Sequence, residues 1–214
     1  MRGFDLDGPV ERVLLLGAHA DDVEIGCGGT VLRLVERNPP VQLRWVVLSA
    51  AGARRDEAIA SAAAFSRGAV HEVVLGDLRD GFLPYEAGAA ATAKELVEAQ
   101  AAFAPDVVFA PHRHDRHQDH RLVSDLAWNS FRDHLVLEYE IPKYDGDVGT
   151  PNVFVPLTDA VAQRKAALLA EHFPSQRDRH WFTTDLFLGV LRVRGMECRS
   201  PWAEAFHGRK VVWS

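Results

Sequence analysis

Residues 13–22 of the chain read Val-Leu-Leu-Leu-Gly-Ala-His-Ala-Asp-Asp. The apolar run at 13–16 predicts a short buried strand, and the polar residues follow at the point where that strand ends. In open α/β folds, ligands bind at the carboxyl ends of parallel strands. The stretch therefore predicts a strand of a parallel sheet with a binding site at its end.

Strand and helix patterns alternate along the rest of the chain. We expect further strands at 41–48, 70–75, 106–110, 135–139, 153–155 and 210–213, and helices at 30–37, 54–65, 87–103, 121–131, 159–171 and 184–193. This order predicts a Rossmann-like, three-layer α/β fold with a mostly parallel sheet. No repeat or linker interrupts the pattern, so we expect a single domain over residues 1–214.

Composition narrows the classes of partner. A net charge of −6 and an isoelectric point near 5.9 argue against nucleic acid or an anionic membrane surface. The first residues carry acids without an apolar core, and no apolar run approaches the roughly 20 residues that span a bilayer. The two cysteines, Cys27 and Cys198, are far apart, which favours a reducing compartment. We therefore expect a cytoplasmic protein.

His19 and the adjacent carboxylates of Asp21 and Asp22 form the first polar cluster. Neighbouring carboxylates repel each other, and their burial is costly unless a cation compensates them. A divalent metal bound by His19 and one aspartate would do so and would leave the other aspartate for proton transfer. The alternative is a polar turn that caps the next helix.

A second cluster, residues 111–120, reads Pro-His-Arg-His-Asp-Arg-His-Gln-Asp-His and follows the predicted strand at 106–110. His117 and His120 are three residues apart, so they share a face of a first helical turn. A hydrolytic metal site needs three protein ligands and one open position. His19, Asp22 and one of these histidines would supply the ligands. We expect His112 and His114 to be solvated loop residues.

These two motifs resemble the His-Pro-Asp-Asp and His-x-Asp-His signatures of the PIG-L/LmbE-like deacetylases, metal enzymes that remove N-acetyl groups from glucosamine derivatives. Further matches are Gly28-Gly29-Thr30, Arg54 with Glu57-Ala58, and Ala203-Glu204-Ala205-Phe206. Residues 140–147, Glu-Ile-Pro-Lys-Tyr-Asp-Gly-Asp, resemble one branch of bacterial members. The resemblance covers most of the chain.

The resemblance implies a role for each residue of the two motifs. Zinc, or iron(II) on the same nitrogen and oxygen donors, would be bound by His19, Asp22 and His120. Asp21 would be the general base for the attacking water. His117, oriented by Asp119, would donate to the developing oxyanion.

The resemblance also implies the substrate, a small N-acetylated amino sugar or a glucosamine-containing conjugate. Arg54 is expected to contact sugar hydroxyls or a phosphate, and Asp80 a hydroxyl. Tyr144 and Trp181 would stack on a sugar ring. The irregular stretches at 76–86, 141–150 and 172–183 are expected to form the walls of the pocket. The oligomeric state is left open, a homo-oligomer included.

Two other interpretations compete with this one. Residues 24–30, Glu-Ile-Gly-Cys-Gly-Gly-Thr, resemble the glycine-rich loop of a methyltransferase, but the preceding strand has already ended at Gly17. Those glycines are better explained as relief of crowding where the first helix packs. The second alternative is a non-catalytic protein that binds a metal or a sugar. Such a protein would have no need of Asp21 beside a ligand or of a His117–Asp119 pair.

Overall fold

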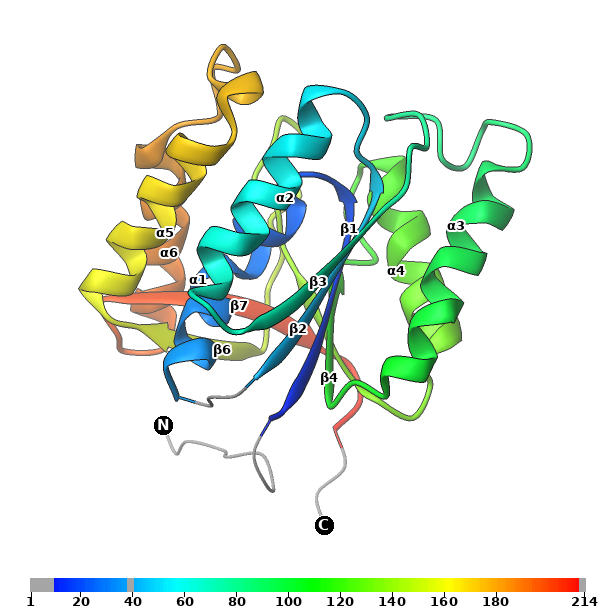
Figure 1. Ribbon diagram of the computed structural model, residues 1–214. Coiled ribbons are helices and arrows are strands. Elements are labelled where there is room, and N and C mark those ends of the chain that lie inside the picture. Colours follow the sequence, from blue (N-terminus) through cyan, green and yellow to red (C-terminus); the bar gives the residue numbers. More distant parts are fainter. Residues whose placement is uncertain (1–9, 38–40, 212–214) are drawn as a thin grey trace.

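The computed structural model describes residues 10–37 and 41–211, and within them seven strands form one sheet (Figure 1). The strands are β1 (Arg12–His19), β2 (Gln42–Ser49), β3 (Val70–Leu75), β4 (Val107–Pro111), β5 (Leu135–Tyr139), β6 (Val153–Leu157) and β7 (Trp202–Gly208). Their order in the sheet is β3-β2-β1-β4-β5-β7-β6. The neighbours from β3 to β5 pair in parallel, whereas β7 is antiparallel to both β5 and β6.

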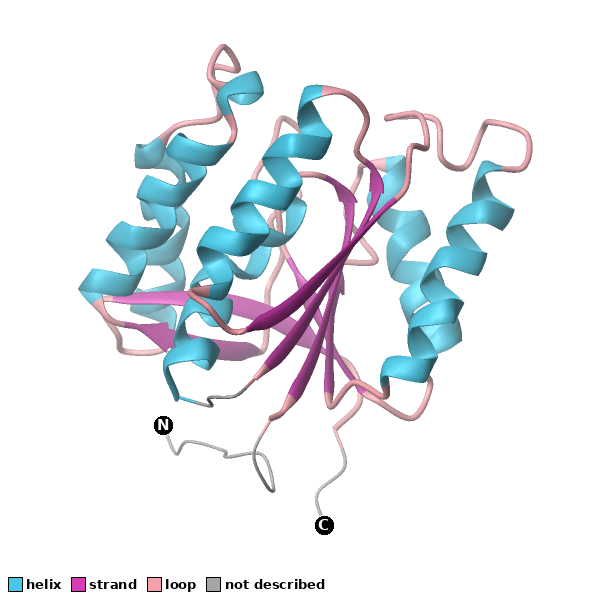
Figure 2. Cartoon of the chain, viewed as in Figure 1, coloured by secondary structure: helices cyan, strands magenta, loops and turns pink. Residues whose placement is uncertain are grey.

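Six α-helices cover the two faces of this sheet in the described part of the chain (Figure 2). They are α1 (Asp22–Arg37), α2 (Ala53–Ser66), α3 (Ala89–Glu98), α4 (Gln118–Ser130), α5 (Asp159–His172) and α6 (Thr184–Glu197), with short 3₁₀ helices at Ala99–Phe103 and Pro174–Gln176. α3 and α4 lie on one face, and the other four helices lie on the opposite face. The predicted three-layer, mostly parallel α/β fold is confirmed.

β1 shows why the fold follows from its sequence. Alternate side chains of the strand enter two different cores: Val13 and Leu15 pack with α1, α2, α5 and α6, whereas Leu14 and Leu16 pack with α3 and α4. A strand covered on both faces needs apolar residues at every position rather than at every second one. The run at 13–16 is therefore fully buried, with at most 1% of any side chain exposed.

α1 begins at Asp22, eight residues before its predicted start at Thr30. The glycines between these two positions suggested a loop, but they lie inside the helix and allow it to pack closely. A Cβ added to Gly26 would lie 2.1 Å from the ring of Tyr139, and one added to Gly28 would lie 2.5 Å from Phe65. Glycine costs a helix about 1 kcal/mol relative to alanine, and here it allows the helix to approach its neighbours. The expected relief of crowding is confirmed.

The expected last strand at 210–213 is wrong. Lys210 and Val211 are exposed and outside any strand, and residues 212 and 213 lie outside the described residues. The last strand is β7, and Glu204 on it is almost fully buried. Its carboxylate accepts the backbone N–H groups of Gly29 and Thr30 at 2.7 and 2.6 Å.

Lys165 of α5 completes this buried contact. Its Nζ donates to Glu204 and to the backbone carbonyl of Ile25, both at 2.6 Å. A regular α-helix would join the N–H of Gly29 to that same carbonyl. The ion pair therefore supplies partners in the middle of α1, and this accounts for an acidic residue inside an otherwise apolar strand.

In the described part of the chain, the apolar stretches of the helices fall short of what crossing a bilayer requires.

Candidate metal centre

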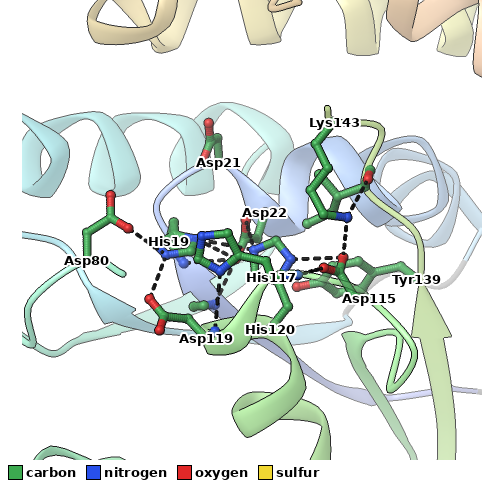
Figure 3. Close-up of polar contacts among 12 residues, drawn as sticks. His19, Asp21, Asp22, Asp80, Asp115, His117, Asp119, His120, Tyr139 and Lys143 are labelled. Atoms are coloured by element: carbon green, nitrogen blue, oxygen red, sulfur yellow. Dashed lines mark hydrogen bonds and ion pairs between the residues drawn. The ribbon is translucent and has the colours of Figure 1, made fainter. Parts of the chain in front are cut away.

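The three predicted ligands meet at the carboxyl end of β1. His19 is the last residue of β1, Asp22 is the first residue of α1, and His120 lies in the first turn of α4. His19 Nδ1 lies 3.2 Å from His120 Nε2 and 3.5 Å from Asp22 Oδ2, and His120 Nε2 lies 3.3 Å from Asp22 Oδ1. Ligands bound to one tetrahedral ion at 2.0–2.1 Å are about 3.3 Å apart. The two histidine nitrogens therefore have the spacing of ligands to one ion, and Asp22 faces each of them with a different carboxylate oxygen (Figure 3).

Three neighbouring hydrogen bonds orient Asp22 and His120. Oδ2 of Asp22 accepts the backbone N–H groups of Ala18 and His19, each at 2.8 Å, which leaves Oδ1 facing His120. His120 Nδ1 lies 2.9 Å from Asp115 Oδ2, so Nε2 is the nitrogen that is free for a metal. A carboxylate behind a ligating histidine is a recurring feature of metal sites.

Asp119 corrects one sequence-based expectation. Its Oδ2 lies 3.2 Å from His19 Nε2, so the carboxylate orients His19 rather than His117. The N–H groups of Gly81 and Leu83 hold the same carboxylate at 2.7 and 3.2 Å. His117 instead caps α4, because its Nδ1 accepts the backbone N–H of Asp119 at 3.3 Å.

Asp80 joins the cluster as well. Its Oδ1 lies 3.0 Å from His19 Nε2, although 77% of the side chain is exposed. Two sets of residues bring potential ligand atoms within 4.8 Å of one another, and Asp22 belongs to neither: His19, His117 and His120, and His19, Asp80, His117 and Asp119. In the set of His19, Asp22 and His120, each histidine presents one nitrogen to Asp22 while its other nitrogen lies beside a second carboxylate, Asp119 or Asp115.

The charges of the three ligands are strongly coupled. Burial disfavours protonation of His19 and His120, but Asp22 and the carboxylates behind the rings outweigh it, which raises the pKa of His19 and brings that of His120 to about 9. Burial would raise the pKa of Asp22, yet the two histidines hold it well below its ordinary value. A metal ion would therefore replace protons that the histidines carry in its absence.

Asp21 points away from this triangle of atoms, as Figure 3 shows. Its Oδ1 forms a 2.6 Å ion pair with Arg54 Nη2. Burial raises the pKa of the Asp21 carboxyl, and the guanidinium of Arg54 opposes that rise. Arg54 also contacts Glu57 and Ser175, both at 3.3 Å. The arginine that was expected to bind substrate therefore contacts the proposed base.

Asp115 and Lys143 are site residues that the sequence reasoning missed. Lys143 Nζ lies 2.9 Å from the Asp115 oxygen that faces His120, and 2.7 Å from Asp147 Oδ2. Asp147 Oδ2 also accepts the N–H of Arg116 at 2.7 Å. Both residues lie in motifs quoted from the sequence, Asp115 in 111–120 and Lys143 in 140–147, but neither had been assigned a role.

The two aromatic candidates lie outside this network. Tyr144 is 74% exposed, and its hydroxyl lies 3.0 Å from His180 Nδ1. Trp181 is half-buried against the core, with its ring edge-on to Phe182 at 5.6 Å. His112, which was expected to be solvated, is buried and lies 2.6 Å from Glu138, whereas His114 is exposed as expected.

The fold and this cluster define an α/β protein in which a sheet edge carries a His/Asp group able to hold a metal ion. The chain belongs to the PIG-L family: the model of that family, described as GlcNAc-PI de-N-acetylase, matches residues 14–131, more than half of the 214 residues.

Solved structures share the fold over nearly the whole chain. N,N'-diacetylchitobiose deacetylase from Pyrococcus horikoshii, complexed with its inhibitor MPG, is 23% identical with a TM-score of 0.72 and covers 95% of this chain and 86% of that one. GalB, a 4-carboxy-2-hydroxymuconate hydratase from Pseudomonas putida KT2440, is 18% identical with a TM-score of 0.74, over 95% and 98%. A zinc-inhibited form of the teicoplanin deacetylase Orf2 is 16% identical with a TM-score of 0.70, over 91% and 96%. Identities this low show a common fold.

Proposed function

We propose that the protein is a metal-dependent hydrolase that removes the N-acetyl group from an N-acetylated amino sugar or a glucosamine-containing conjugate. The observation that carries the proposal is the triangle formed by His19 Nδ1, His120 Nε2 and Asp22, with Asp21 adjacent and outside it. Two nitrogens and one oxygen suit zinc, with iron(II) as the alternative. When bound, such an ion supplies a Lewis acid for the acetamide carbonyl and lowers the pKa of a water molecule in the site.

Asp21 is the general base in the proposed reaction. Arg54 binds Oδ1 of Asp21, so the other carboxylate oxygen is the one that takes the proton from the attacking water. The guanidinium opposes the rise in the pKa of the buried carboxyl and fixes its orientation. Once protonated, Asp21 can deliver the proton to the departing amine. General-base assistance of this kind contributes about 10²–10⁴-fold to the rate.

His117 is the proposed neutral donor to the oxyanion. Burial, and then the proximity of His120 and His19, lower its pKa. Its Nδ1 accepts the N–H of Asp119, so the proton of the neutral ring is on Nε2. That N–H is the group that would donate to the developing negative charge. Asp119 would act on the metal ligand His19 and on the start of α4.

The substrate proposal can be tested by measuring acetate release across a panel of N-acetylated compounds. We expect release from 2-acetamido sugars, with a higher kcat/KM for a conjugate than for free N-acetylglucosamine, because a remote group helps to position the acetamide. Zinc and iron(II) should each be supplied in equimolar amounts, since a zinc-inhibited form is known for a deacetylase of the same fold. Release only from acetylated lysine or simple amides would contradict the proposal, and full metal loading without turnover would favour a binding protein.

The proposal also includes the domain organisation, the compartment and the class of partner. We place the activity in one domain of a cytoplasmic protein that acts on a small molecule and not on nucleic acid or a membrane. Both cysteines are free, in agreement with a reducing compartment.

A further inference from the structure

A hollow that the proposed function does not use lies where β4 and β7 end. It has a volume of about 680 Å³ and is bounded by residues 112–114 after β4, parts of the loop at 147–152 and residues 207–209 at the end of β7. None of these residues belongs to the proposed metal ligands or catalytic groups. The segment 112–114 continues directly into the loop that carries Asp115, His117 and His120.

The floor of the hollow is a fixed polar stack. The rings of His112 and His207 lie face to face, 3.7 Å apart and inclined by 12°. His112 Nδ1 lies 2.6 Å from Glu138 Oε2, and Trp128 Nε1 donates to Glu138 Oε1 at 2.5 Å. Glu138 is fully buried. Nε2 of His207 is also buried and has no hydrogen-bond partner among the described residues, a situation that proteins generally avoid.

Two arginines form the walls with donors to spare. The guanidinium of Arg113 forms no hydrogen bond, ion pair or ring contact with the described residues, and only the backbone N–H of this residue is engaged, with Glu138. Arg209 lies 4.2 Å over the ring of Trp128, with Nη1 3.6 Å from Glu138 Oε1. That distance is longer than a hydrogen bond, so the fork of Arg209 is largely free.

The two acids at this hollow are already compensated. Asp147 accepts from Lys143 Nζ at 2.7 and 2.8 Å and from the N–H of Arg116. Glu138 is bound by His112 and Trp128. The guanidinium of Arg113 is therefore the charge left without a close partner, and Arg209 keeps hydrogen-bond donors available although it forms an ion pair with Glu138. Arg54, the arginine expected to bind a phosphate, is by contrast committed to Asp21 and Glu57.

We propose that this hollow is an oxyanion site of the phosphate class, with Arg113 and Arg209 as its principal ligands and His114 at its rim. Guanidinium groups bind phosphate oxygens through two parallel hydrogen bonds, which a planar fork can supply without rearrangement. The anion is either the phosphate of a monoester carried by the substrate or free inorganic phosphate.

The site is tested by titrating the metal-loaded, full-length protein with inorganic phosphate in a calorimeter. We expect binding to the unaltered protein, weakened about tenfold or more by Arg113→Gln and by Arg209→Gln. Arg164→Gln, which removes the same charge from an exposed position of α5, is the matched control and should bind as the unaltered protein does. Circular dichroism and Tm show whether each variant is folded.

Equal phosphate affinity in Arg113→Gln, Arg209→Gln and the control would overturn the proposal, because the anion would then bind elsewhere, at the metal for example. Absence of phosphate binding to the unaltered protein would overturn it as well. These outcomes do not depend on deacetylation, so the site can be refuted or supported whether or not the proposed function is correct.

Acetate-release kinetics then identify the source of the anion. A KM that Arg113→Gln raises only for a phosphorylated N-acetylglucosamine supports the site as part of the substrate pocket. Phosphate binding that is lost in Arg113→Gln, with unchanged KM for both phosphorylated and unphosphorylated sugars, supports a separate site for free phosphate.

Discussion

Asp21 and Asp22 are neighbours in the sequence, but their carboxylates have different partners. Asp22 lies between His19 and His120 and accepts two backbone N–H groups, whereas Asp21 binds Arg54. A carboxylate held by N–H groups and histidines suits a fixed ligand. A buried carboxyl whose pKa is raised by burial, with one guanidinium opposing the rise, suits a group that exchanges a proton.

We therefore expect Asp21→Asn to retain the metal and to lose at least about 10²-fold in kcat. Metal content by elemental analysis, measured alongside acetate release, checks both parts. Asp22→Asn is the matched control, since it should lose the metal. If Asp21→Asn lost the metal and Asp22→Asn kept it, the two roles would be reversed.

His207 provides a pH dependence that is independent of the metal ligands. Burial lowers its pKa from the ordinary 6.5 to about 4, assisted by His112 and by Arg194 and opposed by Glu138. The unfolded chain therefore binds a proton at a higher pH than the folded protein, and folding stability is lost as the pH falls from 6.5 towards 4.

In urea denaturation between pH 6.5 and 4, the free energy of unfolding should fall more steeply for the unaltered protein than for His207→Gln. The variant lacks this titrating group and retains His112, His114, Glu138 and Arg194. Identical pH dependences would show that His207 does not carry the effect.

How far the sequence predicts the site depends on whether a contact is local. His19, Asp22 and His120 were identified because each ends a strand or begins a helix in a recognisable motif. The partner of Asp119 was not predictable, because His117 and His19 are both within reach of the first turn of α4 and only the position of the β1 end decides between them. Asp115 and Lys143 were missed because their contact joins two separate loops.

At the scale of elements, the loop between β5 and β6 contacts the loop between β4 and α4, which carries Asp115. Lys143 joins Asp115 to Asp147, and Arg194 of α6 binds Glu140 at the start of the loop at 2.7 Å. The loop therefore supports the orientation of His120 through Asp115.

Lys143→Met should weaken metal binding by about 10- to 100-fold, the usual effect of removing a group that orients a ligand. Competition with a chromophoric chelator measures the affinity directly, without reference to activity. Lys94→Met, at an exposed position of α3, serves as control. Unchanged affinity in Lys143→Met would mean that Asp115 orients His120 without help from the loop.

The buried pair of Lys165 and Glu204 joins β7 and α5 to the middle of α1. Glu204→Gln leaves the ammonium group without a counter-charge, so we expect a loss of about 3–5 kcal/mol in the free energy of unfolding. The double variant Lys165→Met/Glu204→Gln removes both charges and should be more stable than the single variant. A single variant as stable as the unaltered protein would show that the pair contributes nothing to folding.

This pair also explains why the last strand was misplaced. Residues 210–213 combine β-branched and aromatic side chains, a local pattern typical of a strand. β7 has an acidic residue at its centre, and only its contacts with α1 and α5 make that acid compatible with burial. The parallel strands were predicted correctly because their signal is a local run of apolar residues.

At the scale of the whole molecule, the sheet brings together residues that are far apart in the sequence. The carboxyl ends of β1 and β4 are neighbours in the sheet, so the loops that follow them place His19, Asp22 and His120 around one point. We therefore propose that this one sheet edge forms one metal centre for hydrolysis of an N-acetyl group.

The most direct test is acetate release from an N-acetylated glucosamine conjugate before chelation, after chelation and after equimolar metal is restored. We predict that release stops when the metal is removed and returns when one divalent ion per chain is bound, but not in His120→Ala. Undiminished acetate release from the metal-free protein would contradict this prediction.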